Sequence, residues 1–279
     1  MRSPSVFLTT VSFVLLTGGC VGFFERELEL VALPYERQLV LNTILSPQDP
    51  QIRADVYVTA PPIGDLPTGF PRNGMVEDAY VRLVGPTDTF MFEFQRLTVG
   101  SPTYLLPQTE VELEVGQLYE VIAEWDGLIA RGQTIIPERM TPRDSITLQE
   151  IRDVDGDRNV LATWPNQMGE ADYYLLFTDE VTHFGGSRSD RVQRVLYDFI
   201  HGRNALGTEL SGELGISPNP DTNVLNICQC TQTIYDYLLT RETLQINDEN
   251  PFAEPTTVAN NLQEGLGLVG AANCWQFAY

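Results

Sequence analysis

The 279-residue chain contains no lysine, so arginine supplies all 17 of its Lys and Arg side chains, against 38 acidic ones. The resulting formal charge of -21 argues against nucleic acid as a partner, because so acidic a protein repels a phosphate backbone. It argues equally against adhesion to anionic lipid through a basic patch. An acidic, lysine-free composition is typical of a host that lives in high salt, and also of a genome that prefers arginine codons.

Histidine is scarce, since His183 and His201 are the only two, and neither has a second histidine or a cysteine at zinc-ligand spacing. A hydrolase triad would need one of them as its base, yet the chain lacks the G-x-S-x-G nucleophile elbow. A phosphate-binding glycine loop and a dinucleotide fingerprint are also missing. Among 38 acidic residues some carboxylate pair always looks plausible, so none is taken as glycosidase machinery. We therefore expect no catalytic residues, no cofactor and no enzymatic activity.

Long apolar runs are also missing after the N-terminus, which excludes a later membrane-spanning helix. Residues 1–19 are typical of a lipoprotein signal peptide: Arg2 is followed by a short apolar stretch at 6–16 and small residues at 17–19. These small residues precede Cys20, as in the lipobox that bacterial lipoprotein signal peptidase reads. Thr17 departs from that pattern, which usually has leucine there. An ordinary secretory signal or an uncleaved anchor is the alternative interpretation.

A lipidated Cys20 would carry a diacylglycerol on its thiol and a further acyl chain, such as palmitate, on its amine. Two or three acyl chains suffice for stable membrane anchoring, whereas one does not. Residues 20–35 then form a tether that includes Glu25, Glu27 and Glu29. In some Gram-negative bacteria, acidic residues near the acylated cysteine accompany export to the outer face of the outer membrane. We therefore expect the chain to be anchored there and to face the cell exterior.

Residues 36–138 carry period-two hydrophobic patterns separated by turn signals, which predicts an immunoglobulin- or fibronectin-like β-sandwich domain. A loop rich in proline and glycine occupies residues 60–74. The expected strands lie at 38–45, 51–59, 79–84, 89–94, 109–115, 118–125 and 128–136.

Residues 145–279 predict a second β-rich domain, after a linker at 139–144. Its expected strands lie at 145–151, 159–164, 171–178 and 222–230, while 179–214 shows one clear apolar stretch, at 195–200. Residues 231–245 predict a helix capped by Thr231, with an apolar stripe that would lie across the end of the second sandwich. That stripe comprises Ile234, Tyr237, Leu238 and Leu244. The fold class is therefore mainly β.

Three carboxylates at alternate positions, Asp153, Asp155 and Asp157, form a weak candidate for a structural calcium site. The segment matches an EF-hand loop poorly, and a hairpin turn accounts for the same residues. With Cys20 lipidated, Cys228, Cys230 and Cys274 remain, so an oxidising compartment predicts one disulfide and one free thiol. Cys228 and Cys230 share a face of one strand and are poorly placed to bond each other. Cys274 is therefore expected to pair with one of them, and a metal or redox site at C-x-C is the alternative.

The C-terminal third contains a recurrent pattern: a Y-x-Y-L helix core, an N-P-F-x-E-P segment and an N-x-x-x-G-x-G-x-x-G tail. The residues at these positions are Tyr235, Tyr237, Leu238, Asn250, Pro251, Phe252, Glu254, Pro255, Asn261, Gly265, Gly267 and Gly270. This pattern resembles the ending of a family of Bacteroidota outer-membrane lipoproteins known as domain of unknown function 4249. The resemblance covers about residues 25–275, and the run AANCWQFAY at the end departs from the family tail.

The resemblance implies an outer-membrane lipoprotein of the kind found with TonB-dependent transporters, and it supplies no catalytic residue. We therefore expect a non-enzymatic surface lipoprotein that works as an accessory or ligand-presenting partner of a TonB-dependent β-barrel transporter. The alternative is a free-standing glycan- or peptide-binding module, in which exposed aromatic residues such as Phe70 would stack on sugars. Fold analogy alone does not decide between them.

Overall fold

The computed structural model describes residues 35–61, 66–96, 102–139, 141–152, 156–166, 173–182, 191–202, 208–218, 222–248 and 256–279. Every strand and helix named below lies in one compact unit, Arg37–Ala60 with Pro67–Tyr279. Among the described residues, no helix is both long and apolar enough to cross a membrane. The described part of the chain is mainly β, with strands in several sheets and one long helix, as the sequence predicted.

The first core lies between two sheets built largely from the N-terminal half. One sheet contains β1 (Leu39–Leu45), β2 (Gln51–Val58), β5 (Glu93–Gln95) and β6 (Thr103–Pro107). The facing sheet contains β3 (Tyr80–Val84), β4 (Thr89–Met91), β7 (Leu118–Trp125), β8 (Leu128–Ile135) and β15 (Leu262–Glu264). Strict alternation in β1 and β2 buries every second side chain, so this half is sandwich-like as predicted.

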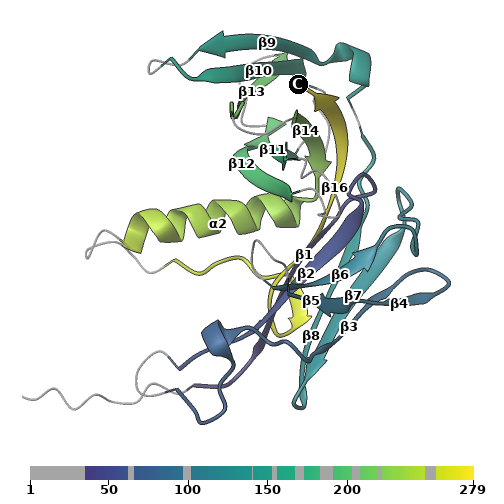
Figure 1. The fold of residues 1–279 in the computed structure, drawn as a ribbon, viewed down its shortest axis with the longest axis vertical. Helices are drawn as coiled ribbons and strands as arrows, with labels where there is room; N and C mark the ends of the chain where they lie inside the picture. Colours follow the sequence, from purple (N-terminus) through teal and green to yellow (C-terminus); the bar gives the residue numbers. More distant parts are fainter. Residues whose placement is uncertain are drawn as a thin grey trace, which may run out of the picture. The chain divides into compact units, whose positions relative to one another are not determined.

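The C-terminal strand β16 (Leu266–Ala278) belongs to both halves of the fold (Figure 1). Its first residues pair in parallel with β1, and its last residues pair antiparallel with β14 (Thr222–Cys230). The eight-stranded sheet therefore runs β12-β11-β14-β16-β1-β2-β6-β5, where β11 is Tyr173–Thr182 and β12 is Arg191–His201. Val269 and Ala271 of β16 are fully buried in the first core.

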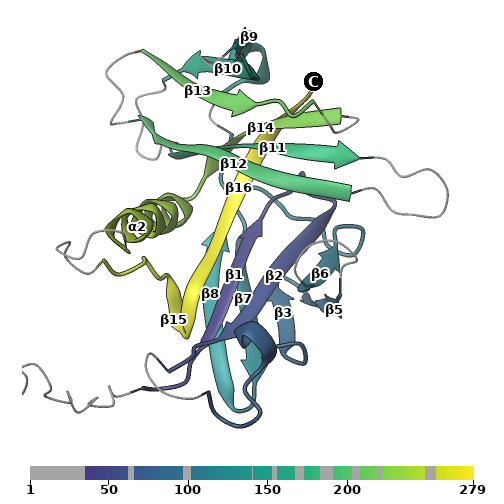
Figure 2. The same cartoon turned by 60° about the vertical axis from the view of Figure 1, so that its left-hand side comes forward.

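A second core lies between β11, β14, β16 and a three-stranded sheet (Figure 2). That small sheet comprises β9 (Thr147–Arg152), β10 (Arg158–Pro165) and β13 (Glu209–Gly215). Trp164 of β10 is 1% exposed and its ring packs against Tyr174 of β11. Alternation along β10 and β13 buries one face against this core, which is the sheet-on-sheet packing expected of a sandwich.

The helix α2 (Gln232–Asp248) covers the other face of the eight-stranded sheet. Ile234 and Leu238 are buried against Leu175, Cys228 and Leu268, which come from three neighbouring strands. Ile234, Leu238 and the partly buried Tyr237 of the predicted stripe thus form the packing face, whereas Leu244 is not part of this core. The helix lies on a sheet face, however, and not across the end of the sandwich, because the side chains of β11 and β14 that point away from the second core need cover.

Two strand predictions were wrong. The expected strand at 89–94 divides into β4 and β5, which belong to different sheets. Residues 109–115 alternate as expected, with Val111 and Leu113 buried in the first core, but their backbone joins no described sheet. The pairing partner of β2 is instead β6, the run Thr103–Pro107. Alternation records burial on one side, and burial alone does not place a neighbouring strand within hydrogen-bonding distance. Two short 3-10 turns, η1 (Arg72–Gly74) and η2 (Arg143–Ser145), complete the described elements.

The linker that leads into the three-stranded sheet lies along β16. The guanidinium of Arg139 lies 3.8 Å from the centre of the Trp275 ring, and that of Arg143 lies 4.9 Å from the Phe277 ring. The indole N–H of Trp275 donates to the backbone oxygen of Thr141. The terminal run that departs from the family tail is therefore the part of β16 that pairs with β14 and holds the linker.

Candidate functional site

Most of the predicted calcium and lipid sites cannot be placed. Cys20, Asp153 and Asp155 lie outside the described residues. Asp157 is described and comes directly before β10, whose first residue Arg158 pairs with Arg152 of β9. No group of three or more His, Cys, Asp or Glu side chains suited to hold a metal occurs in the part of the chain that the structure describes. His183 also lies outside that part, and His201 stacks on Tyr173.

Of the two cysteines that could pair with Cys274, the structure selects Cys228. The two residues lie directly opposite in the β14–β16 pairing, and their sulfurs are bonded. Cys230 is buried and has a free thiol. Burial raises the pKa of the Cys230 thiol, because a thiolate would be desolvated there. The thiol therefore stays protonated and is a poor nucleophile or metal ligand.

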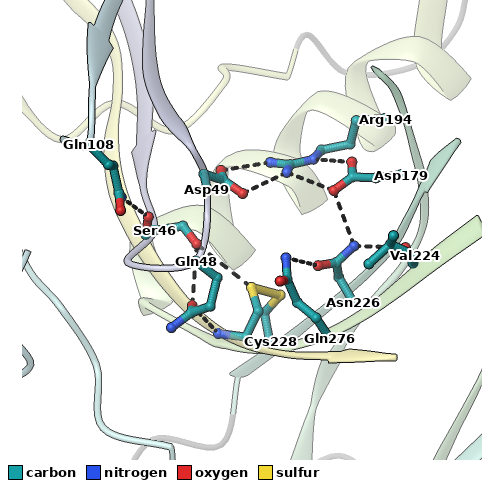
Figure 3. A network of polar contacts seen from close by, with 11 residues as sticks. Ser46, Gln48, Asp49, Gln108, Asp179, Arg194, Val224, Asn226, Cys228 and Gln276 are labelled. Atoms are coloured by element: carbon teal, nitrogen blue, oxygen red, sulfur yellow. Dashed lines mark hydrogen bonds and ion pairs between the residues drawn. A yellow bond between two sulfur atoms is a disulfide. The ribbon is translucent and has the colours of Figure 1, made fainter. Parts of the chain in front are cut away.

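A polar junction surrounds this disulfide (Figure 3). Arg194 of β12 donates two hydrogen bonds to Asp49, in the turn after β1, and two to Asp179 of β11. Its guanidinium also lies 4.0 Å from the centre of the Phe177 ring. Burial disfavours the charge on Arg194, but the hydrogen bonds to Asp179 and Asp49 outweigh it, so the pKa of Arg194 rises.

The same turn is fastened to β16 by amide side chains. The side-chain N–H of Gln48 donates to Asn273, and its side-chain oxygen accepts from the backbone N–H of Cys274. The side-chain amide of Gln108 donates to the backbone oxygen of Ser46. All four carboxylate oxygens of Asp49 and Asp179 accept hydrogen bonds. We therefore interpret this network as a structural junction between the turn after β1 and the second half of the sheet.

The described residues of the family pattern also build the fold. The Asn261 side chain both donates to the backbone oxygen of Val269 and accepts from its N–H, as a neighbouring strand would. A Cβ on Gly267 would lie 2.2 Å from the Leu41 oxygen, and one on Gly270 would lie 2.4 Å from Ile234. Tyr235 packs its ring against Tyr173. Residues 250–255 of the pattern lie outside the described residues.

A separate hollow on the second half is the best candidate for a ligand site. It is about 440 Å³ in volume, which falls in the usual range for small-molecule pockets. Strands β10, β12 and β13 supply its lining, which comprises Asn159, Leu161, Asp198, Ser211, Gly212, Glu213 and Gly215. Leu161 and Glu213 are opposite one another in the β10–β13 pairing, as are Asn159 and Gly215.

Asp198 reaches the hollow from a different sheet. It lies in β12 beside a register shift, where Leu176 pairs with Asp198 but the next residue, Phe177, pairs with Leu196. Such a bulge commonly re-aims a side chain. Burial raises the pKa of Asp198; the hydrogen bond from the Phe199 N–H lowers it, and nearby Glu242 raises it further. The balance is upward, so the ionised carboxylate is disfavoured where it stands.

Sequence reasoning missed this site because it assigned no strands to most of residues 179–214. One signal could have found Asp198, which interrupts the apolar alternation of Leu196 and Ile200 with a carboxylate. A partly buried charge at such a position within a strand costs free energy unless it is paired or hydrogen-bonded. Chemically, the hollow offers two carboxylates, an amide and a hydroxyl, which is a set suited to binding a polar ligand.

The whole sequence was also compared with known proteins. The model of the family described as Domain of unknown function (DUF4249) matches residues 25–276. A search among curated proteins gave no match. The family match spans both cores, the helix α2 and nearly all of β16. The chain therefore belongs to the DUF4249 family.

Proposed function

We propose that this chain is a non-enzymatic lipoprotein of the outer membrane of a Bacteroidota host, where it presents a ligand to a TonB-dependent β-barrel transporter. The observation that carries the proposal is the open polar hollow, whose side chains stand on strands of two sheets. Rigid strands hold binding groups more accurately than loops do, which suits capture of a ligand. The signal-like segment that ends at Cys20 supports the membrane location.

The lining supports binding more than catalysis. Ser211 is the hydroxyl residue of the described lining, and no histidine or cysteine accompanies it there. A serine hydroxyl that no histidine activates is a weak nucleophile.

The decisive experiment is recovery of the tagged full-length chain from gently solubilised native outer membranes, followed by mass spectrometry. We expect a stoichiometric TonB-dependent barrel to accompany it, and the N-terminal peptide to begin at an acylated Cys20. A Cys20→Ala variant, which cannot accept the diacylglycerol, is the control and should lose both the membrane and the barrel. Recovery of the acylated chain alone would contradict the accessory role.

The acidic tether supports an exterior orientation. Glu25, Glu27 and Glu29 follow the acylation site closely, so we place the anchored chain on the outer face. Protease added to intact cells should then digest it, and the Glu25→Gln, Glu27→Gln, Glu29→Gln variant should become protected. Protection of the unaltered chain in intact cells would place it in the periplasm.

A free-standing binding module is the second candidate, because the hollow would serve that role equally well. Phe70, the aromatic residue first considered for sugar stacking, is partly buried against the first core. The seven described lining residues of the hollow also include no aromatic ring. These observations favour a peptide or another polar small molecule over a glycan as the ligand.

A further inference from the structure

Among its described lining residues, the hollow between β12 and β13 has two acidic side chains and no basic one. Asp198 comes from the eight-stranded sheet and Glu213 from the three-stranded sheet, and none of the lining residues that the structure describes is positively charged. The arginines with described side chains on the lining strands bind other carboxylates. Arg158 of β10 hydrogen-bonds to Glu150 through two nitrogens, and Arg194 of β12 binds Asp49 and Asp179. The lining therefore attracts a cation.

The other lining groups define the shape of that cation. Asn159 and Ser211 can donate and accept hydrogen bonds, and Gly215, opposite Asn159, leaves the space beside its amide uncovered by a side chain. Leu161 stands opposite Glu213 and offers an apolar wall next to a carboxylate. This combination fits a charged nitrogen on a short aliphatic stem, since the stem can contact Leu161 while the nitrogen meets the acids.

The setting of Asp198 in β12 is consistent with the same conclusion. Its carboxylate is partly buried beside a bulge, and one oxygen accepts a hydrogen bond from the backbone N–H of Phe199. Burial, and then the charge of nearby Glu242, disfavour the ionised form and raise the pKa of Asp198. A bound cation would offset that unfavourable charge. Disfavoured carboxylates in clefts are more common at functional sites than elsewhere.

We propose that this hollow binds a small ligand through an ammonium or guanidinium group held between Asp198 and Glu213. The assignment rests on the ligand-presenting role proposed above and names the chemistry of its ligand. A volume of about 440 Å³ admits one or two amino acid residues or a short diamine, but not a folded partner. The shared chemistry is the charged nitrogen, and either a peptide or a free amine could supply it.

Calorimetric titration of the purified full chain with three probes tests the assignment. The probes are Nα-acetyl-lysine methylamide, its uncharged norleucine analogue and putrescine. We expect the cationic probes to bind and the norleucine analogue to bind at least tenfold more weakly. Asp198→Asn or Glu213→Gln should weaken cation binding about tenfold or more, the usual effect of losing a charge-assisted hydrogen bond. Tighter binding of the lysine compound indicates a peptide source, and tighter binding of putrescine indicates a free amine.

Glu209→Gln is the matched control, because Glu209 is an exposed acid on the same strand and is not part of the lining. Equal binding of lysine and norleucine compounds, or an equal loss of binding in the Glu209 variant, would overturn the assignment. Glu213 is exposed, so its variant should fold even if the Asp198 variant does not. The Glu213→Gln variant should still recover a barrel from membranes, so failure of the hollow is distinguishable from failure of the accessory role.

Discussion

Gly267 of β16 lies directly against the backbone of β1, opposite Leu41. Its φ of 122° lies in a region that favours glycine, and a Cβ there would lie 2.2 Å from the Leu41 oxygen. Backbone strain and overpacking should together make Gly267→Ala cost about 3 kcal/mol of unfolding free energy. Gly116→Ala is the control, because Gly116 has a φ of 79° but open space around it. In denaturant titrations the Gly116→Ala variant should lose only about 1 kcal/mol of unfolding free energy. Equal losses in the two variants would disprove the contact at Gly267.

Asp198 is a residue whose ionisation we expect to lower the stability of the fold. Its pKa is raised above the usual 3.8, so the folded state binds the proton more tightly than the unfolded state does. The stability that protonation of Asp198 contributes is fully present below pH 3.8 and is lost as pH rises through the raised pKa. Asp198→Asn, which keeps an acceptor for the Phe199 N–H, should therefore be more stable than the unaltered chain at pH 7, with the difference vanishing in acid.

Thermal unfolding of both proteins between pH 3 and 8 measures this difference. Glu209→Gln controls for the loss of one negative charge. A less stable Asn variant at pH 7 would show that Asp198 has a structural role, whereas a more stable variant that no longer binds cations would identify a ligand-binding residue.

At the scale of elements, the disulfide between β14 and β16 closes a covalent loop of the chain that contains α2. It joins residues 46 apart in sequence, so its removal should lower the unfolding free energy by about 3–4 kcal/mol. The Cys228→Ala, Cys274→Ala double variant tests this against Cys230→Ala, which removes the buried free thiol and leaves the disulfide intact. The double variant should also lose any response of its melting temperature to a reductant. An unchanged response would show that another bond is being reduced.

At the scale of the whole molecule, the eight-stranded sheet makes the two halves interdependent. β1 lies between β2 and β16, and the first core includes Val269 and Ala271 from near the C-terminus. A fragment limited to residues 36–138 lacks this strand, so we expect it to show no cooperative unfolding transition, whereas 36–279 should show one. Adding a synthetic peptide of residues 256–279 should restore order to the fragment. A sharp transition in the fragment alone would show that β16 is dispensable for the first core.

Local periodicity by itself determined much of the strand content and the one helix. β1 and β2 were predictable because one face of each strand is buried, and alternation of apolar side chains reports that burial directly. β7 and β8 follow this pattern less strictly, since Leu118 and Ile135 are about half exposed. The apolar stripe of α2, including Ile234 and Leu238, was predictable for the same reason. The targeting segment ending at Cys20 is likewise a property of sequence alone, and the prediction made from it awaits experiment.

Only the tertiary structure decided which distant segments meet. The pairing of β16 with both β1 and β14 placed Cys274 opposite Cys228 and left Cys230 free, an outcome that spacing had left open. It also explains why Gly267 tolerates no side chain. Asp198 and Glu213 likewise line one hollow only because β12 and β13, which belong to different sheets, come together in the fold. Hydrophobic pattern specifies which side chains are buried, whereas the partner that buries them is chosen by packing across the whole chain.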